Sequence, residues 1–110
     1  MSAITGNVKF GVNNPIYINS VSQSPYNLSA YEYNYVIVNV SANFIINLPP
    51  VNSVPNGWTV LITNIGVIGT IVTVNANGTD SFYPSGIQAL ETGITHQYIA
   101  NHTNNIWSVY

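Results

Sequence analysis

The 110-residue sequence contains almost no charge and no cysteine. Its only charged side chains are Lys9, Glu32, Asp80 and Glu91, against 46% hydrophobic residues, whereas about a quarter of the residues in a typical domain are charged. The lack of cysteine excludes a disulfide, a zinc-thiolate cluster and a cysteine nucleophile. With a single lysine and no arginine, one chain cannot line a phosphate backbone with positive charge, which excludes nucleic-acid binding.

Long hydrophobic runs are also missing. The first residues, Met1 to Gly6, lack the basic start and the apolar stretch of a secretory signal, and no segment approaches the ~18 consecutive apolar residues of a membrane helix. We therefore expect a soluble protein without membrane insertion, made in a cytoplasm. Its formal net charge of -2 leaves little repulsion between copies, so the composition favours self-association.

What the sequence does contain is a succession of strand formers and turn residues, with no helical stripe longer than about one turn. Every second side chain is apolar in residues 36–40 and 44–48, as expected for strands that bury one face. The longer strands that we expect are 36–40, 44–48, 58–64, 70–74, 96–100 and 106–110. Gly66 and Gly69 bracket the turn between the third and the fourth, which predicts a hairpin. No internal repeat with a fixed period is evident.

Residues 1–25 differ from the remainder of the chain. They contain two short extended runs, 8–12 and 16–21, separated by Asn13-Asn14-Pro15. Two alternatives are open: an N-terminal arm that attaches to a neighbouring subunit or a larger assembly, or the first hairpin of the same sheet. In either case residues 26–110 form the main domain, which we expect to be all-β, with an antiparallel β-sandwich as one architecture that fits.

Several short motifs from Tyr33 to Tyr110 occur in a recognisable order. They are Val36 to Asn39, Leu48-Pro49-Pro50, Gly57-Trp58-x-Val60-x-Ile62-x-Asn64, Val72-x-Val74, Gly78-x-Asp80, Leu90 with Gly93, and Asn105-x-Trp107-x-Val109. This order resembles the β-rich domains of bacteriophage tail fibres, head fibres and related virion surface proteins, although Asn39 stands where that family often has an acid. The resemblance implies a β-prism as the alternative architecture, in which three copies intertwine as a homotrimer on a virion surface. Other virion proteins would then be partners, contacted through residues 1–25 in the arm alternative.

The three acids are the only candidates for acid-base chemistry, and their setting argues against catalysis. A glycosidase needs two carboxylates roughly 5 to 9.5 Å apart. Asp80 ends the segment Asn77-Gly78-Thr79-Asp80, in which a short acid usually caps a turn. Neither Gly-x-Ser-x-Gly nor His-Glu-x-x-His occurs. We therefore expect no enzyme activity, no catalytic residue and no cofactor.

His96 and His102 are the only imidazoles in the chain. A histidine near the axis of a trimer would offer three nitrogens to one metal ion, but such sites favour a compact His-x-His pattern that is absent here. We expect both side chains to be exposed polar groups and predict no metal site.

Aromatic residues are better candidates for contacts. Tyrosine and tryptophan rings fill cores and protein interfaces, and they also stack on sugars. The structural use is the commoner of the two, because these residues are enriched at interfaces. We single out Tyr31, Tyr33, Tyr83 and Trp107 as candidate contacts with a partner protein or with a glycan on a host surface.

Overall fold

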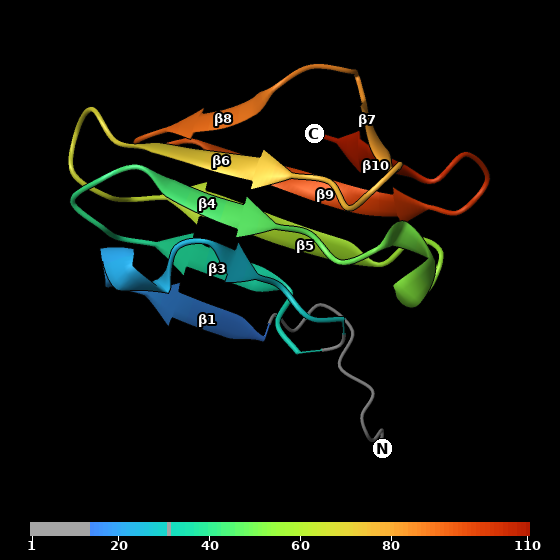
Figure 1. The fold of residues 1–110 in the computed structure, drawn as a ribbon, viewed down its shortest axis with the longest axis horizontal. Coiled ribbons are helices and arrows are strands. Elements are labelled where there is room, and N and C mark those ends of the chain that lie inside the picture. Colours follow the sequence, from blue (N-terminus) through green and yellow to red (C-terminus); the bar gives the residue numbers. More distant parts are fainter. Residues whose placement is uncertain (1–13, 31) are drawn as a thin grey trace.

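The computed structural model describes residues 14–30 and 32–110, and in this part of the chain the regular structure is β-strand apart from two short 3-10 turns. The elements are β1 (Pro15–Ile18), η1 (Val21–Gln23), β2 (Tyr26–Asn27), β3 (Tyr35–Val38), β4 (Phe44–Asn47), η2 (Val51–Ser53), β5 (Thr59–Asn64), β6 (Ile71–Asn75), β7 (Ser81–Tyr83), β8 (Gln88–Glu91), β9 (Thr95–Asn101) and β10 (Ile106–Val109). Sheet A has the order β1-β3-β5-β9-β10-β7, and sheet B has the order β2-β4-β6-β8. The expected all-β class is confirmed, with the two sheets forming two layers (Figure 1).

The first six strands alternate between the two sheets. β1, β3 and β5 are parallel neighbours in sheet A, while β2, β4 and β6 are parallel neighbours in sheet B. The chain therefore winds through three coils, each of which gives one strand to each layer, as in a flattened solenoid. The expected antiparallel sandwich is wrong for this part of the molecule.

The predicted hairpin of residues 58–64 and 70–74 is also wrong, because β5 and β6 lie in different sheets. After β5 the chain turns into the other layer and does not pair back onto β5. Instead, Ile65 N–H donates to Val38 O (2.8 Å) and Val67 N–H donates to Val40 O (3.1 Å). These bonds continue the parallel ladder past the end of sheet A, so they carry the chain across to sheet B.

The first two coils repeat after 20 residues, which is the separation between Asn27 and its register partner Asn47. The next step along the same ladder, from Asn47 to Asn75, takes 28 residues, since η2 lengthens the connection from β4 to β5. The 20-residue step thus occurs once, between the first two coils, and no fixed period extends over all three coils. The trace of this step in the sequence is the pair Tyr26-Asn27-Leu28 and Ile46-Asn47-Leu48.

The last strands add antiparallel neighbours to both sheets. β8 runs antiparallel to β6 in sheet B, β9 runs antiparallel to β5 in sheet A, and β10 runs antiparallel to β9. The short strand β7 then pairs in parallel with β10 at the far edge of sheet A. Residues 96–100 and 106–110 were expected to form the closing strands, and β9 and β10 confirm this.

One hydrophobic core lies between the layers. Val36 and Val38 of β3 and Phe44 and Ile46 of β4 are fully buried, which confirms the buried faces expected from the alternation. Tyr98 and Trp107 are the largest enclosed side chains. Burying a valine, isoleucine or phenylalanine side chain contributes roughly 1.5 to 3 kcal/mol, so the buried residues of the alternating strands stabilise the fold.

Within residues 1–25, the described part forms β1, η1 and the approach to β2. β1 lies at the edge of sheet A, where it pairs in parallel with β3. The extended run 8–12, on which both the arm and the hairpin alternatives depended, lies outside the described residues.

Candidate interaction surfaces

The acids and histidines of the described residues are spread over the fold. The Asp80 carboxylate accepts a hydrogen bond from Val51 N–H (2.8 Å), which is 29 residues earlier and opens η2. Glu32 and Glu91 are exposed, one before β3 and the other at the end of β8. Among residues 14–30 and 32–110, no three His, Asp or Glu side chains are grouped closely enough to hold a metal ion.

Both imidazoles contact other groups of the chain. His102 Nε2 lies 2.7 Å from Val54 O, and the His102 N–H donates to Asn56 Oδ1 (3.0 Å). These bonds tie the β9–β10 turn to the segment that follows η2. His96 Nδ1 lies 3.5 Å from the Tyr98 hydroxyl, whose ring it meets edge-on.

The four aromatic candidates do not gather at one place. Trp107 is completely buried, with its ring 6.1 Å from that of Trp58 in an edge-to-face arrangement, so it offers no face to a ligand. Tyr33 is half-buried against the core before β3, whereas Tyr83 is 68% exposed on β7, at the opposite edge of sheet A. Tyr31 lies outside the described residues.

Two tyrosines have altered acidity. Burial raises the pKa of Tyr98, whose hydroxyl lies 3.3 Å from Gln88 Oε1. Partial burial raises the pKa of Tyr26, and the nearby Glu32 and Tyr33 add to the effect. Both hydroxyls therefore lose their proton less readily than a solvent-exposed tyrosine, because a phenolate would lose its hydration inside the protein.

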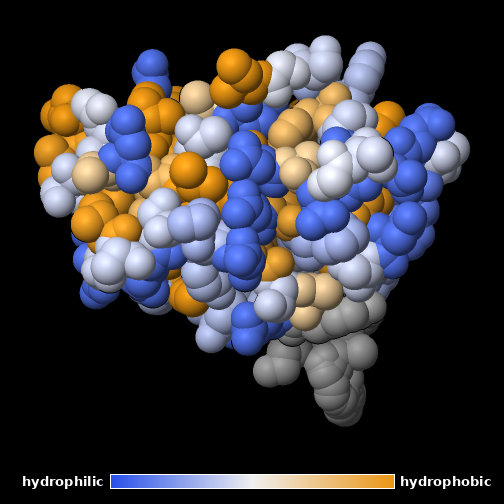
Figure 2. Space-filling view, viewed as in Figure 1, coloured by the Kyte–Doolittle hydropathy of each residue, from blue (hydrophilic) through white to orange (hydrophobic). Residues whose placement is uncertain are grey.

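A ladder of asparagine amides crosses the outer face of sheet B. Asn47 Nδ2 donates to Asn27 Oδ1 (2.8 Å), and Asn75 Nδ2 donates to Asn47 Oδ1 (3.1 Å). The in-register parallel pairing of β2, β4 and β6 brings identical side chains together in this way. A hydrophilic stripe crosses the middle of the molecular face in Figure 2.

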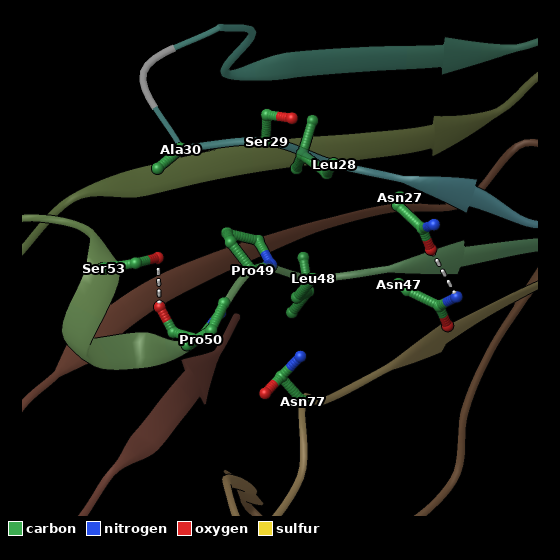
Figure 3. A pocket seen from close by; sticks show the side chains of 10 residues that line it. All are labelled: Asn27, Leu28, Ser29, Ala30, Asn47, Leu48, Pro49, Pro50, Ser53 and Asn77. Atoms are coloured by element: carbon green, nitrogen blue, oxygen red, sulfur yellow. Dashed lines mark hydrogen bonds between the residues drawn. The ribbon is translucent and has the colours of Figure 1, made fainter.

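A hollow of about 390 Å³ lies where β2 and β4 end, beside this ladder (Figure 3). This volume is at the lower end of the range for small-ligand pockets. Proline rings and leucine side chains form its apolar part, and amides and hydroxyls form its polar part. None of the described residues that line it is charged. The lining residues are Asn27, Leu28, Ser29, Ala30, Asn47, Leu48, Pro49, Pro50, Ser53 and Asn77.

The other end of the molecule is organised by Asn64, a fully buried polar residue at the end of β5. Its Nδ2 donates to Leu90 O (2.9 Å) and Thr70 O (3.1 Å), and its Oδ1 accepts from Gly66 N–H (2.8 Å). One amide therefore joins the β5–β6 connection to β8. Several aliphatic side chains of the β5–β6 connection are nevertheless exposed to solvent.

This apolar connection was not identified from the sequence as a surface of interest. The signal is Ile65-Gly66-Val67-Ile68-Gly69, an aliphatic turn in a place where polar residues are usual. Ile68 is 90% exposed. Large aliphatic residues held outward in a turn indicate a contact surface.

No protein-family model, no curated protein and no solved structure matches this chain. In the described residues no helix is long and apolar enough to cross a membrane. The similarity to phage fibre domains therefore stays a prediction from the motifs.

Proposed function

We propose that this chain is a non-enzymatic structural module of a virion surface, which assembles as a homotrimer in a fibre, a spike or a capsid decoration. The proposal combines the motif order with the physical character of the surface. Residues 26–110 would form the body of each subunit, and the three copies would be arranged about a threefold axis.

The observation that carries the proposal is the amount of apolar surface left open in a single chain that has so few charges. The large hydrophobic side chains exposed by 39% or more are Tyr17, Val21, Ile45, Ile65, Val67, Ile68, Tyr83, Ile87, Ile94 and Tyr110. Association would remove part of this surface from water, which gains about 25 cal/mol per Å² of apolar area. Closed association also protects sheet edges from unlimited aggregation.

The use of polar groups supports a structural role. Asp80, His102 and Asn64 each bond to backbone groups of a distant segment, so these side chains serve to hold connections in place. A side chain engaged in this way contributes to stability through a bond that is worth roughly 0.5 to 1.5 kcal/mol.

The virion assignment is tested on particles. Antibodies against the purified chain should label intact particles from a culture that produces it, and quantitative mass spectrometry should find the chain in multiples of three. Absence of the chain from purified particles would overturn the assignment. Polysaccharide cleavage that is abolished by Asp80→Asn or Glu91→Gln would replace it with a depolymerase function.

A second candidate function, recognition of a host-surface glycan, is favoured by the hollow in Figure 3. Its lining combines neutral amides and hydroxyls with the rings of Pro49 and Pro50, which suits an uncharged sugar. We expect a glycan array to give a hit that Asn77→Ala removes and Asn104→Ala, at an exposed position outside the hollow, retains. If the unmodified protein gives no hit on the array, glycan recognition is rejected and only the structural role on the virion remains.

A further inference from the structure

Most of the exposed aliphatic side chains lie at one end of the molecule. They come from η1, from the start of β4, from the β5–β6 connection and from the β8–β9 turn, and we call this set the apolar end: Val21, Ile45, Ile65, Val67, Ile68 and Ile94. In Figure 2 hydrophobic residues gather at the left of the molecule, where Figure 1 places the β5–β6 connection. Among residues 14–30 and 32–110, the one other large aliphatic side chain that is exposed is Ile87, in the β7–β8 connection.

Hydrogen bonds between these connections show that they are neighbours. Val67 N–H donates to Val40 O (3.1 Å), and Thr92 Oγ1 donates to Val67 O (3.0 Å). Ile45 N–H donates to Ser24 Oγ (3.0 Å), which joins β4 to the residue that follows η1. Connections that are far apart in the sequence thus form one surface.

The apolar end is held in a fixed shape before any partner binds. Asn64 fixes the β5–β6 connection from inside, and Gly93 N–H donates to Asn64 O (2.7 Å) from the β8–β9 turn. Gly66 has no room for a side chain, because a Cβ there would lie 2.5 Å from Val40 O. A pre-organised surface loses little conformational entropy on binding.

Charge indicates what kind of partner fits this surface. Glu91 is exposed at the end of β8, close to the apolar end, and the described residues include no lysine or arginine. An anionic membrane attracts basic residues, so it is a poor match. A second copy is a good match, because a surface without a strong charge does not repel itself.

The outer face of sheet A is the main competing surface, and its centre has less apolar area to gain, although Tyr17 of β1 and Tyr83 of β7 are exposed at its edges. Ile37 and Thr63, two of its central outward-facing residues, are only 9% and 6% exposed because their neighbours already cover them. Ile68 at 90% and Val67 at 58% have much more surface to bury. Since the gain follows the area removed from water, contact at the apolar end is favoured.

We propose that the apolar end is the surface through which copies of this chain associate, with Ile68 at the centre of the contact. This inference rests on the proposed homotrimer and names its interface. Strands would then lie side by side within one subunit, while subunits meet through the connections at this end.

The test uses two isoleucines of almost equal exposure, Ile68 at 90% and Ile87 at 89%. We expect the unmodified protein and Ile87→Asp to sediment as trimers. Trimers of Ile68→Asp should begin to dissociate at a concentration at least about tenfold higher than trimers of the unmodified protein, because a buried carboxylate opposes the contact. Circular dichroism checks that each variant is folded. Ile68→Asn is a second, uncharged replacement if Ile68→Asp does not fold.

The outcomes separate the inference from the proposed function. If Ile68→Asp and Ile68→Asn stay trimeric at the dilution at which the unmodified protein does, the interface lies elsewhere and the homotrimer stands. If the unmodified protein is a monomer, the homotrimer itself is wrong. Flotation of the unmodified protein with phosphatidylcholine vesicles would assign the apolar end to a lipid surface and overturn the inference.

Discussion

Single residues with buried polar groups have the clearest consequences in this protein. Asn64 is fully buried, and its amide satisfies the carbonyls of Thr70 and Leu90 and the N–H of Gly66. A buried polar group that loses its partner costs about 1 to 3 kcal/mol. The shape of the apolar end therefore depends on one side chain.

We predict that Asn64→Ala lowers the free energy of unfolding by at least about 3 kcal/mol, since it leaves several buried groups unpaired at once. Guanidinium chloride unfolding followed by tryptophan fluorescence measures the change. Asn104→Ala, at an exposed position, is the control and should stay within about 0.5 kcal/mol of the unmodified protein. Similar values for the two variants would show that Asn64 does not organise this end.

The buried hydroxyl of Tyr98 makes the free energy of unfolding depend on pH in the alkaline range. Burial raises its pKa above the ordinary value of about 10, so above that pH the unfolded chain loses a proton that the folded chain keeps. Stability from this group is complete below pH ~10 and falls as the pH rises further, by up to about 1.4 kcal/mol per pH unit. We expect Tyr98→Phe to have a shallower fall between pH 9 and 11 in urea unfolding. An unchanged slope would contradict this assignment.

The role of individual aromatic residues could not be predicted from the sequence. Alternation in Asn105-x-Trp107-x-Val109 indicates that Trp107 and Val109 share a face, but not which face is covered by the other sheet. The structure places Trp107 in the core beside Trp58, and leaves Tyr83 outside. Packing between segments that are distant in the sequence makes this choice.

Among the elements, individual strands were predictable and their pairing was not. Residues 36–40 and 44–48 have the buried faces that their alternation indicates, because the alternation is a local property. The two glycines after β5 are compatible both with a hairpin and with a crossing between sheets. The crossing forms here because Val38 and Val40 carbonyls accept hydrogen bonds from the connection, which no local pattern reports.

The asparagine ladder should stabilise the parallel strands of sheet B. Asn47 is the central member and makes both amide bonds, so we expect Asn47→Ala to lower the free energy of unfolding by about 1 to 3 kcal/mol. Asn52→Ala, at an exposed position of η2, is the matched control and should have little effect. Equal effects of the two substitutions in denaturant titrations would mean that the ladder does not stabilise its three strands.

The hollow and the apolar end lie at sites that only the coiled topology creates. Asn27, Asn47 and Asn77 are remote in the sequence, and the parallel stacking of β2, β4 and β6 brings them to one place. The 20-residue spacing of Asn27 and Asn47 was present in the sequence. A motif that occurs only twice, with one spacing between its copies, does not reveal the coil without the structure.

At the scale of the whole molecule, the scarcity of charge predicts how stability responds to salt. Exposed ion pairs and charge repulsion are the interactions that salt screens. The chain has one lysine and three acids, so little is left to screen. We predict that the midpoint of thermal unfolding changes by less than about 3 °C between 20 mM and 200 mM sodium chloride. A sharp fall over this range would show that charge pairs matter more than burial.

The self-association of this weakly charged, strand-built chain is the central claim, and its mass in solution tests it most directly. Sedimentation equilibrium of the unmodified 110-residue chain over a dilution series gives that mass without a label. We predict a single species of three chains over the upper part of the series. A folded species of one chain at every concentration would contradict the account.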